Sequence, residues 1–446
     1  MPDAIGIDIG SSFIKAARID LDRLELRRTC RAPFPEFLGG LPPLYCEADP
    51  AAVLAAVEDV LALLGEGERG CEGLVLCGQM HGFVLVNPHG EAVSNYISWL
   101  DQRVSRTEFD ALCALVTEAD RAALGYEFRP SIALPLLWWL GRRGALPAGA
   151  TPVSIADFVA ARLCGEPPVM DPTQAAAFGA LRLDALDWHA EVIGKVGLDG
   201  LRWPPVRPSG AVVGKWRGAP CHASVGDQQC ALAGALLGAD ELSVNIGTGS
   251  QVAMLAAAPA SPGHQVRPYF DGAWLGTITH IPGGRALSAL IGLLTELGGD
   301  ADADAWRYIE RAVERTPATD LRAGVAFFPG ACGERGFLEN LHEGNLGVGH
   351  VFRAVFESMA ANYATCARRL DNARAAERLV FSGGVARRLG VLREHTAAAL
   401  GLPYRLSPHP EDTLFGLMVL ALAFGSRHDG PRTTAEATAM LARRSA

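Results

Sequence analysis

The stretch ELSVNIGTGSQVAML (residues 241–255) repeats the pattern of DAIGIDIGSSFIKAA (residues 3–17), which opens the chain. When Asn245 is laid over Asp8, glycine falls on glycine and apolar residues fall on apolar residues. Each copy has an apolar run, a glycine, small hydroxyl-bearing residues and a second strand-like run, a pattern typical of a β-hairpin. Because the copies open the two halves of one chain, they predict a duplicated architecture.

The chain has 446 residues, which is enough for two or three domains, and its composition is that of a globular protein. Hydrophobic residues make up 49% and charged residues 20%, which excludes wholesale disorder. A net charge of -9 argues against a nucleic-acid partner, because a general polyanion binder needs a basic face. A small phosphorylated ligand held by local groups stays compatible with this charge.

The ends of the chain and its cysteines bear on location. The N-terminus reads as a strand containing Asp3 and Asp8 with no basic segment, so we expect no secretory signal. The apolar run 414–424 is too short to cross a bilayer and predicts a buried helix, so we expect no membrane partner. The ten cysteines form no CxxC pair and no Cys/His cluster, which indicates reduced core thiols and a cytoplasmic protein.

The first half alternates strands with helices, which predicts α/β layers. We expect strands at 5–9, 13–19 and 73–77, and a helix at 50–64 that begins with proline. A looser region follows from 101 to 214, with one helix around Trp138 and Trp139.

The second half repeats this scheme. A strand ASVG leads into the helix DQQCALAGALLG, after which we place the domain boundary, giving domains 1–238 and 239–446. The later predicted elements are a helix at 349–370, a strand RLVFSGG entering a helix at Ala386, a strand near Tyr404 and a closing helix from Asp412.

The turns of the two hairpins offer backbone N–H groups at close range, because glycine lets the chain approach a ligand. Ser11, Ser12 and Thr248 add hydroxyl groups suited to phosphate oxygens. Asp8, just before the first turn, is placed to hold Mg²⁺ through water. Two ordinary hairpins are the plain alternative, but the paired occurrence favours phosphate binding. No P-loop and no dinucleotide fingerprint is present, so ATP would be clamped between the hairpins.

The segment SVGDQQC (residues 224–230) puts Asp227 at the end of a strand and the start of a helix. It could cap the helix, which is worth about 1 kcal/mol. It could also act as a general base that takes the proton of an attacking hydroxyl.

The segment CGQMHG (residues 77–82) ends a buried strand with Gln79, Met80 and His81 between two glycines. A lone histidine is more often structural, but a polar run at a strand tip commonly lines a pocket in α/β folds.

The segment SWLDQR (residues 98–103) offers Trp99, Asp101 and Arg103. An aromatic face beside a carboxylate and a guanidinium suits a polyhydroxylated sugar. An interfacial tryptophan beside a surface ion pair explains the same residues equally well.

Two glycine-bounded loops of the second half are also candidates. Gly383 and Gly384, between a buried strand and a helix, allow close approach of a ribose or base, although a plain turn would use them too. Glu334 and Arg335 form either a polar pair that bridges the two lobes or a solvated turn.

Taken together, these motifs resemble the FGGY family of carbohydrate kinases, which implies the two-lobed actin/hexokinase/Hsp70-like (ribonuclease H-like) α/β fold with duplicated domains and a cleft between them. The resemblance covers essentially the whole chain. The motifs in order are GIDIGSSFIKA, GQMHG, WLDQR, VGDQQ, NIGTGS, GERG, FSGGVARR and the final helix around Gly416.

The resemblance implies ATP and Mg²⁺ as cofactors, Asp227 as the catalytic base and Asp8 at the metal. The sugar contacts implied are Gln79, Met80, His81, Trp99, Asp101 and Arg103. The ATP contacts implied are Ser11, Ser12, Lys15, Gly247, Thr248, Gly249, Gly383 and Gly384.

Three departures from the family pattern are visible. Ser11 stands where the family often has threonine, which keeps the hydroxyl. Val385 stands where many members have a third glycine, which bears on the adenine contacts. The segment GERGFL lacks the proline that usually follows, which bears on Glu334 and Arg335.

Within the family, GQMHG is the form of xylulokinases and sedoheptulokinases, and segments 162–179, 267–287 and 347–364 look more like the sedoheptulokinases. This implies phosphorylation of a ketose, sedoheptulose first, at its terminal primary hydroxyl. A kinase for xylulose or another polyol and a non-catalytic sugar or nucleotide sensor are the alternatives. Sugar and ATP are the expected partners, and a homodimer stays open.

Overall fold

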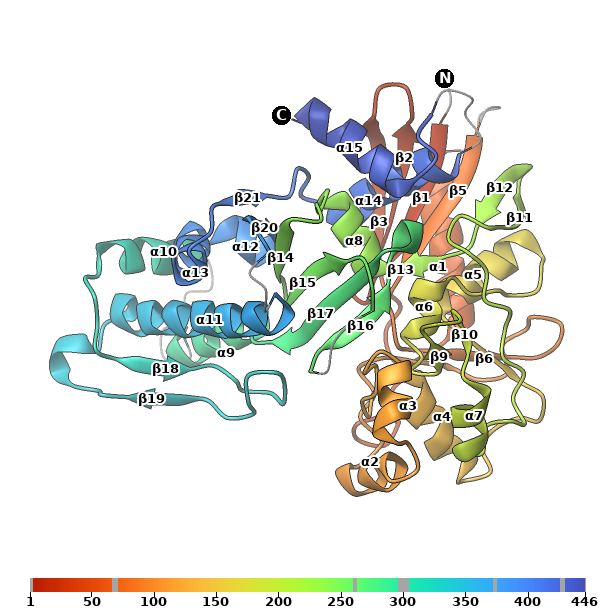
Figure 1. Cartoon of the computed structure of the whole chain (residues 1–446), viewed down its shortest axis with the longest axis horizontal. Helices are drawn as coiled ribbons and strands as arrows, with labels where there is room; N and C mark the ends of the chain where they lie inside the picture. The colour runs from red at the N-terminus through yellow and green to blue at the C-terminus, as the bar shows by residue number, and fades with distance from the viewer. Residues whose placement is uncertain are drawn as a thin grey trace. The chain divides into compact units, whose positions relative to one another are not determined.

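The computed structural model describes residues 3–65, 71–259, 263–295, 305–371, 375–425 and 430–445 (Figure 1). The chain divides into two compact units. Unit 1 comprises Met1–Leu236, Ala257–Trp274 and Glu411–Ala446, and unit 2 comprises Leu237–Ala256 and Leu275–Pro410.

The central sheet of unit 1 has the strand order β11-β12-β5-β1-β2-β3, with β13 also paired to β5. Its strands are β1 (Asp3–Ile9), β2 (Phe13–Asp20), β3 (Glu25–Pro33), β5 (Cys71–Gly78), β11 (Val212–Trp216), β12 (Ala219–His222) and β13 (Val225–Gly226). Strand β1 is antiparallel to β2 and parallel to β5, as the predicted hairpin and alternation require. The predicted strands at 5–9, 13–19 and 73–77 are confirmed.

Helices cover both faces of this sheet. Because side chains alternate along a strand, Ile5, Ile7 and Ile9 join the core formed with α1 (Pro50–Leu63) and α5 (Ile155–Cys164). The other face packs on α8 (Asp227–Gly234) and α14 (Asp412–Phe424). A Cβ atom on Gly6 would lie 2.9 Å from Cβ of Leu417, so this glycine permits the close approach of α14 to β1.

The region from 101 to 214 is more regular than the sequence predicted. Its helices are α2 (Arg106–Cys113), α3 (Glu118–Ala123), α4 (Ala133–Gly141), α5, α6 (Pro172–Ala176) and α7 (Ala190–Lys195), and a third hydrophobic core lies among most of them. The helix expected at Trp138 and Trp139 is α4. The starts of α2 and α3 could have been predicted from their capping boxes, because Ser105 and Thr117 are each followed three residues later by an acidic residue.

Unit 2 repeats the topology of unit 1. Its strands β14 (Glu241–Ile246), β15 (Ser250–Ala256), β17 (Trp274–Ile281), β20 (Arg378–Ser382) and β21 (Tyr404–Leu406) run in the order β17-β15-β14-β20-β21. Strand β14 is antiparallel to β15 and parallel to β20, just as β1 is to β2 and β5. This repeated arrangement confirms the duplicated architecture.

The helices of unit 2 pack around one core. They are α9 (Gly284–Thr295), α10 (Ala305–Arg315), α11 (Val348–Leu370), α12 (Gly384–Arg388) and α13 (Gly390–Leu400). The predicted helix at 349–370 is therefore α11, and the helix expected after RLVFSGG is α12.

The two hairpins differ by one residue in their turns. Four residues (10–13) lie between the paired Ile9 and Ile14, so Asp8 pairs with Lys15. Three residues (247–249) lie between the paired Ile246 and Ser250, so Asn245 pairs with Gln251. Laying Asn245 over Asp8 in the sequence without a gap instead places Val252 on Lys15. The shorter second turn shifts that register by one position.

The division into units differs from a single cut after residue 238. The carboxyl-terminal segment returns to unit 1 because the apolar helix α14 packs on α8 and on β1. Residues 257–274, which include β16 (Gln265–Pro268), also belong to unit 1. Helix α14 does not close the chain, since α15 (Thr434–Ser445) follows it.

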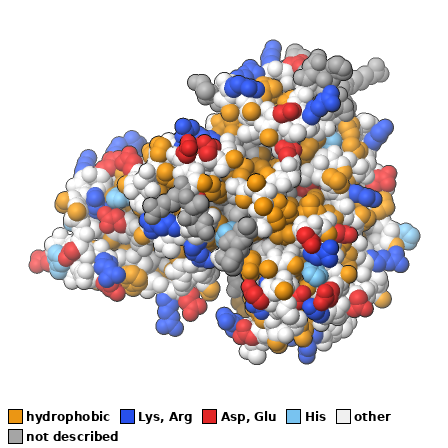
Figure 2. Space-filling model, viewed as in Figure 1, with side chains coloured by type: hydrophobic (Ala, Val, Ile, Leu, Met, Phe, Trp, Pro, Cys, Tyr) orange, Lys and Arg blue, Asp and Glu red, His pale blue; other side chains and the backbone are white. Residues whose placement is uncertain are grey.

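The cysteines, the helix lengths and the surface charge bear on the expectations from composition. All ten cysteines are free thiols. No helix within the described ranges combines the length and apolarity needed to cross a membrane. Acidic and basic side chains are interspersed on the face shown in Figure 2.

Candidate active site

Three strands of unit 1 end at the same edge of the sheet. In the parallel pairings, Ile9 of β1 and Gly226 of β13 both lie beside Gly78 of β5. The residues that follow directly are Gly10, Gln79 and Asp227. The register therefore brings the hairpin turn, the GQMHG segment and the candidate base to one edge, where ligands bind in parallel α/β sheets.

Asp8 is buried at this edge and is held by two donors. The Thr413 hydroxyl donates to Oδ2 at 2.6 Å and the Cys77 thiol donates to Oδ1 at 3.7 Å. Burial raises the pKa of the Asp8 carboxyl, while Thr413 and the charge of Lys15 oppose that rise. Lys15 itself forms an ion pair with Glu411 at 2.6 Å.

This donor set fits Mg²⁺ bound together with a phosphate. Mg²⁺ typically takes one or two carboxylates, waters and substrate phosphate oxygens instead of an all-protein cage. Over the described part of the chain, no group of three or more His, Cys, Asp or Glu side chains could hold a metal ion by itself. Asp8 is a carboxylate whose buried charge a cation would stabilise.

Asp227 is the first residue of α8, and the capping position belongs to Gly226, with no side-chain cap. Burial and the nearby charge of Asp8 raise the pKa of the Asp227 carboxyl to about 7, against the N–H of Gln228 and the charge of Arg267. A pKa near neutrality is the value that suits a general base working at neutral pH.

The GQMHG segment is tightly packed. The Gln79 N–H donates to the carbonyl of Ile9 at 2.9 Å, which joins β5 to the first hairpin. Met80 is buried against Gly226, where an added Cβ would lie 2.9 Å from the Met80 sulfur. His81 has a φ of 76°, a left-handed conformation that is strained for a residue with a side chain.

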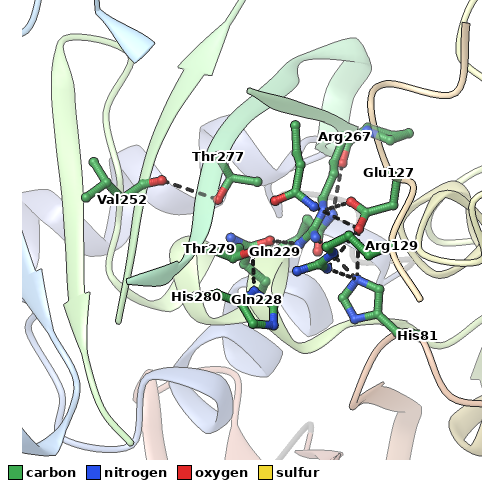
Figure 3. Close-up of polar contacts among 12 residues, drawn as sticks. His81, Glu127, Arg129, Gln228, Gln229, Val252, Arg267, Thr277, Thr279 and His280 are labelled. Carbon is green, nitrogen blue, oxygen red and sulfur yellow. Dashed lines mark hydrogen bonds and ion pairs between the residues drawn. The ribbon is translucent and has the colours of Figure 1, made fainter. Parts of the chain in front are cut away.

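His81 belongs to a charged cluster that was not predicted from the sequence (Figure 3). Its Nε2 lies 3.1 Å from Glu127 Oε1, 3.2 Å from Arg129 Nη2 and 3.3 Å from Arg267 Nη2. Burial lowers the pKa of His81 to about 4, and the two guanidinium groups act in the same direction. The imidazole is therefore neutral at neutral pH.

Trp99, Asp101 and Arg103 lie in and after a turn that follows β7 (Tyr96–Ile97). Trp99 is partly exposed, whereas Asp101 is fully buried. The Arg103 guanidinium donates to both oxygens of Asp101, at 2.8 and 2.6 Å, and also to Glu47. The pair thus organises its own loop, and its contact with a sugar stays a prediction.

Two other segments of unit 2, the start of α9 and Gly383 before α12, contact the second hairpin. The N–H of Gly284 donates to the carbonyl of Gly247 at 2.8 Å, and the N–H of Arg285 donates to Thr248 at 2.8 Å. Gly383, with a φ of 88°, comes so near β14 that an added Cβ would lie 2.6 Å from the carbonyl oxygen of Ile246. Thr248 itself is exposed at the turn. The candidate ATP residues of unit 2 therefore cluster.

The remaining candidates are at the surface of their loops. Ser11 is partly exposed and Ser12 is exposed in the first hairpin turn, as phosphate donors need to be. Glu334 and Arg335 are both exposed.

The site residues that were not predicted from the sequence lie far along the chain from the residues they contact. Thr413 and Cys77 contact Asp8, and Glu127, Arg129 and Arg267 surround His81. Only Cys77 had a signal, because its place one residue before Gly78 in β5 puts it beside Asp8.

Comparison with known proteins points to one family. Residues 4–238 match the model of the N-terminal domain of the FGGY family of carbohydrate kinases, and residues 300–424 match the model of its C-terminal domain. Human sedoheptulokinase is 25% identical over 90% of this chain and 94% of its own length. The xylulose kinase of Klebsiella pneumoniae is 26% identical over 48% of this chain and 44% of its own.

Solved structures show the same fold. A ligand-bound xylulose kinase from Lactobacillus acidophilus superimposes with a TM-score of 0.86 at 18% identity, covering 98% of this chain and 91% of its own. Plasmodium falciparum glycerol kinase with ADP gives a TM-score of 0.80 at 18% identity, covering 95% of this chain and 90% of its own. With two family domains matched and the two-unit fold shared, this chain belongs to the FGGY family of carbohydrate kinases.

Proposed function

We propose that this carbohydrate kinase transfers the γ-phosphoryl group of ATP to the terminal primary hydroxyl of a ketose, and that sedoheptulose is its preferred acceptor. The observation that carries the proposal is the common edge of β1, β5 and β13, where Asp8, GQMHG and Asp227 follow adjacent parallel strands. Sedoheptulose is favoured because similarity to human sedoheptulokinase extends over 90% of this chain.

Asp227 is proposed as the general base. Its carboxylate would accept the proton of the acceptor hydroxyl while that oxygen bonds to the γ-phosphorus and the bond from phosphorus to the ADP oxygen breaks. The raised pKa of Asp227 makes it a better proton acceptor than an ordinary aspartate while leaving it largely ionised just above neutral pH. A carboxylate that only capped α8 would need neither property.

Asp8 is proposed to hold Mg²⁺, which when bound would neutralise charge on the phosphate oxygens. Thr413 and Cys77 would keep the Asp8 carboxylate oriented through their hydrogen bonds. Ser11, Ser12 and Lys15 would add donors and a positive charge beside the same strand.

The glycine loops of unit 2 are proposed to bind ATP. Thr248 and Gly249 would offer their N–H groups to the phosphates, and Gly247, whose N–H donates to the carbonyl of Gly249 at 3.0 Å, would hold the turn in shape. Gly383 and Gly384 would face the adenosine. Close packing of the loops supports this, because it fixes the backbone before the ligand arrives. Transfer needs both substrates bound at once, so ADP formation should depend on the sugar.

The test is an ADP-release assay with the purified full chain over ketoses and polyols from C3 to C7. Sedoheptulose should give the highest kcat/KM, and ADP release should be slow without an acceptor. A clear preference for xylulose would overturn the choice of sugar. Absence of sugar-dependent ADP release with every acceptor would favour a non-catalytic sugar or nucleotide sensor.

A further inference from the structure

Arg267 contacts three elements of unit 1 with its three guanidinium nitrogens. Nε donates to Glu127 Oε2 at 2.7 Å, Nη1 donates to Gln228 Oε1, and Nη2 lies 3.3 Å from His81 Nε2. Gln228 follows Asp227 directly, and His81 ends the QMH segment. One side chain from β16 therefore joins the two segments that carry the proposed base and the proposed sugar contacts (Figure 3).

The pair of Arg267 and Glu127 is almost completely buried, with side chains exposed by 2% and 1%. Burial alone would raise the pKa of Glu127, but Arg267, His81 and Arg129 hold it well below its usual value, so the carboxylate is charged. A buried ion pair is a poor source of stability, because its desolvation cost offsets much of the attraction. An apolar pair at these positions could pack as well, but it could not make the directed hydrogen bonds of Arg267.

The contacts of Arg267 also set how the Gln228 amide and the His81 imidazole are oriented. The Arg267 guanidinium donates to the amide oxygen of Gln228, so the Nε2 amino group of Gln228 points the other way. The same guanidinium contacts Nε2 of His81, so Nδ1 lies at the other edge of the imidazole ring. His81 keeps its strained φ of 76° while it is held in this way. Strain of this kind persists only where surrounding contacts determine it.

We infer that Arg267 is a positioning residue for the sugar: through Glu127, Gln228 and His81 it sets the orientation of the polar groups beside Asp227. This inference rests on the proposed function. Arg267 would act through these three partners. In the sequence it opens the segment 267–287, which resembles the sedoheptulokinases.

The kinetic test uses Arg267→Met and the double variant Glu127→Gln/Arg267→Met. The double variant removes one negative and one positive charge, so the net charge of the cluster is unchanged. In Arg267→Met alone, Glu127 keeps its ion pair with Arg129 at 3.0 Å. Both variants should raise the KM for the sugar by at least about tenfold, with a smaller loss of kcat and an unchanged KM for ATP. A merely stabilising Arg267 would instead let the double variant recover the sugar KM along with its melting temperature.

Arg18→Met is the matched control. Arg18 forms an ion pair with Asp3 at 2.6 Å in the same unit, at the opposite end of β1 from Asp8. Its loss should leave the sugar KM within about twofold of the wild type, a factor worth less than 1 kcal/mol.

A second readout does not depend on turnover. Ring ¹⁵N and ¹³C NMR shifts of His81, assigned with His81→Gln, report its tautomer and hydrogen bonding. They should change in folded Arg267→Met and stay unchanged in Arg18→Met. If they change while no sugar is phosphorylated by the wild type, positioning of His81 holds and the proposed function fails. Unchanged His81 shifts in Arg267→Met would overturn the inference.

Discussion

The hydroxyl of Thr413 donates a 2.6 Å hydrogen bond to the carboxylate of Asp8, although 405 residues of chain separate them. The contact exists because α14 returns to pack on β1 within unit 1. The residue proposed to hold the metal is thus oriented by the segment that contains one of the chain's last helices.

Replacing this hydroxyl tests the metal assignment. In Thr413→Val the Asp8 carboxylate loses a donor, so its pKa should rise and its hold on the cation should weaken. We expect the Mg²⁺ concentration for half-maximal activity to rise roughly three- to tenfold, as for a hydrogen bond worth about 1 kcal/mol. Thr396→Val removes another buried hydroxyl, which donates to Leu392, and should leave the Mg²⁺ requirement unchanged. Equal Mg²⁺ curves for Thr413→Val and wild type would contradict the assignment.

The base is tested by Asp227→Asn, which keeps the shape of the side chain and removes the proton acceptor. Turnover should fall about 10²- to 10⁴-fold. ATP binding, followed by calorimetry, should change little. Asp120→Asn removes a different helical carboxylate, paired with Lys195, and serves as the control. Wild-type turnover in Asp227→Asn would show that another group takes the proton.

The raised pKa of Asp227 predicts how the activity changes with pH. Its pKa is raised to about 7, so the base is protonated and inactive at lower pH, and activity should increase as pH rises through its pKa. Without divalent cation, carboxyl NMR should show a titration near pH 7. Adding Mg²⁺ should move that titration to lower pH, because a cation at Asp8 favours the ionised carboxylate. A titration of Asp227 below pH 5 in the metal-free protein would be incompatible with this account.

Asp157 predicts a pH-dependent stability. It is buried in α5, accepts from Ser154 and Ser224 at 2.6 Å each, and burial raises its pKa to about 7. Because the unfolded chain releases this proton near pH 4 and the folded chain near pH 7, the folded state loses stability as pH rises between them. At pH 8, Asp157→Asn should be more stable than wild type by at least about 1 kcal/mol, judged against 1.4 kcal/mol per unit of pKa shift.

Denaturant unfolding at pH 5 and pH 8 measures this. The gain from Asp157→Asn should shrink at the lower pH, where the folded aspartate is already neutral. An Asn variant that is less stable than wild type at pH 8 would mean that Asp157 folds as a charged group.

The glycine loops are tested by Gly383→Ala. A methyl group there meets the carbonyl of Ile246 at 2.6 Å in addition to the strain of a φ of 88°. The KM for ATP should rise at least about tenfold while the sugar KM stays constant, since the change lies in the proposed nucleotide loops. Gly401→Ala has a similar φ of 69° with nothing within 4 Å, so it separates backbone strain from the collision. Equal ATP KM values for the two variants would remove Gly383 from the nucleotide site.

Much of the candidate site could be predicted because it lies on strand ends. The apolar runs of β1, β5 and β14 and the glycines after them are local signals, and parallel pairing then brings Asp8, Gln79 and Asp227 to one edge. The resemblance of the ordered motifs added the roles. Asp101 and Arg103 show the limit of such reading: an ion pair was one of two alternatives open from the sequence, and only the structure shows that the pair forms and that it is buried.

The sequence by itself determined the duplicated α/β architecture, the family and the residues at the strand tips, because these follow from periodicity and from glycine turns within short segments. Only the tertiary structure decided that α14 returns to unit 1 to hold Asp8 through Thr413, and that Arg267 joins His81 to Gln228. The physical reason is that both depend on side chains brought together over long stretches of chain. Packing and charge pairing between distant segments leave no periodic trace in the local sequence.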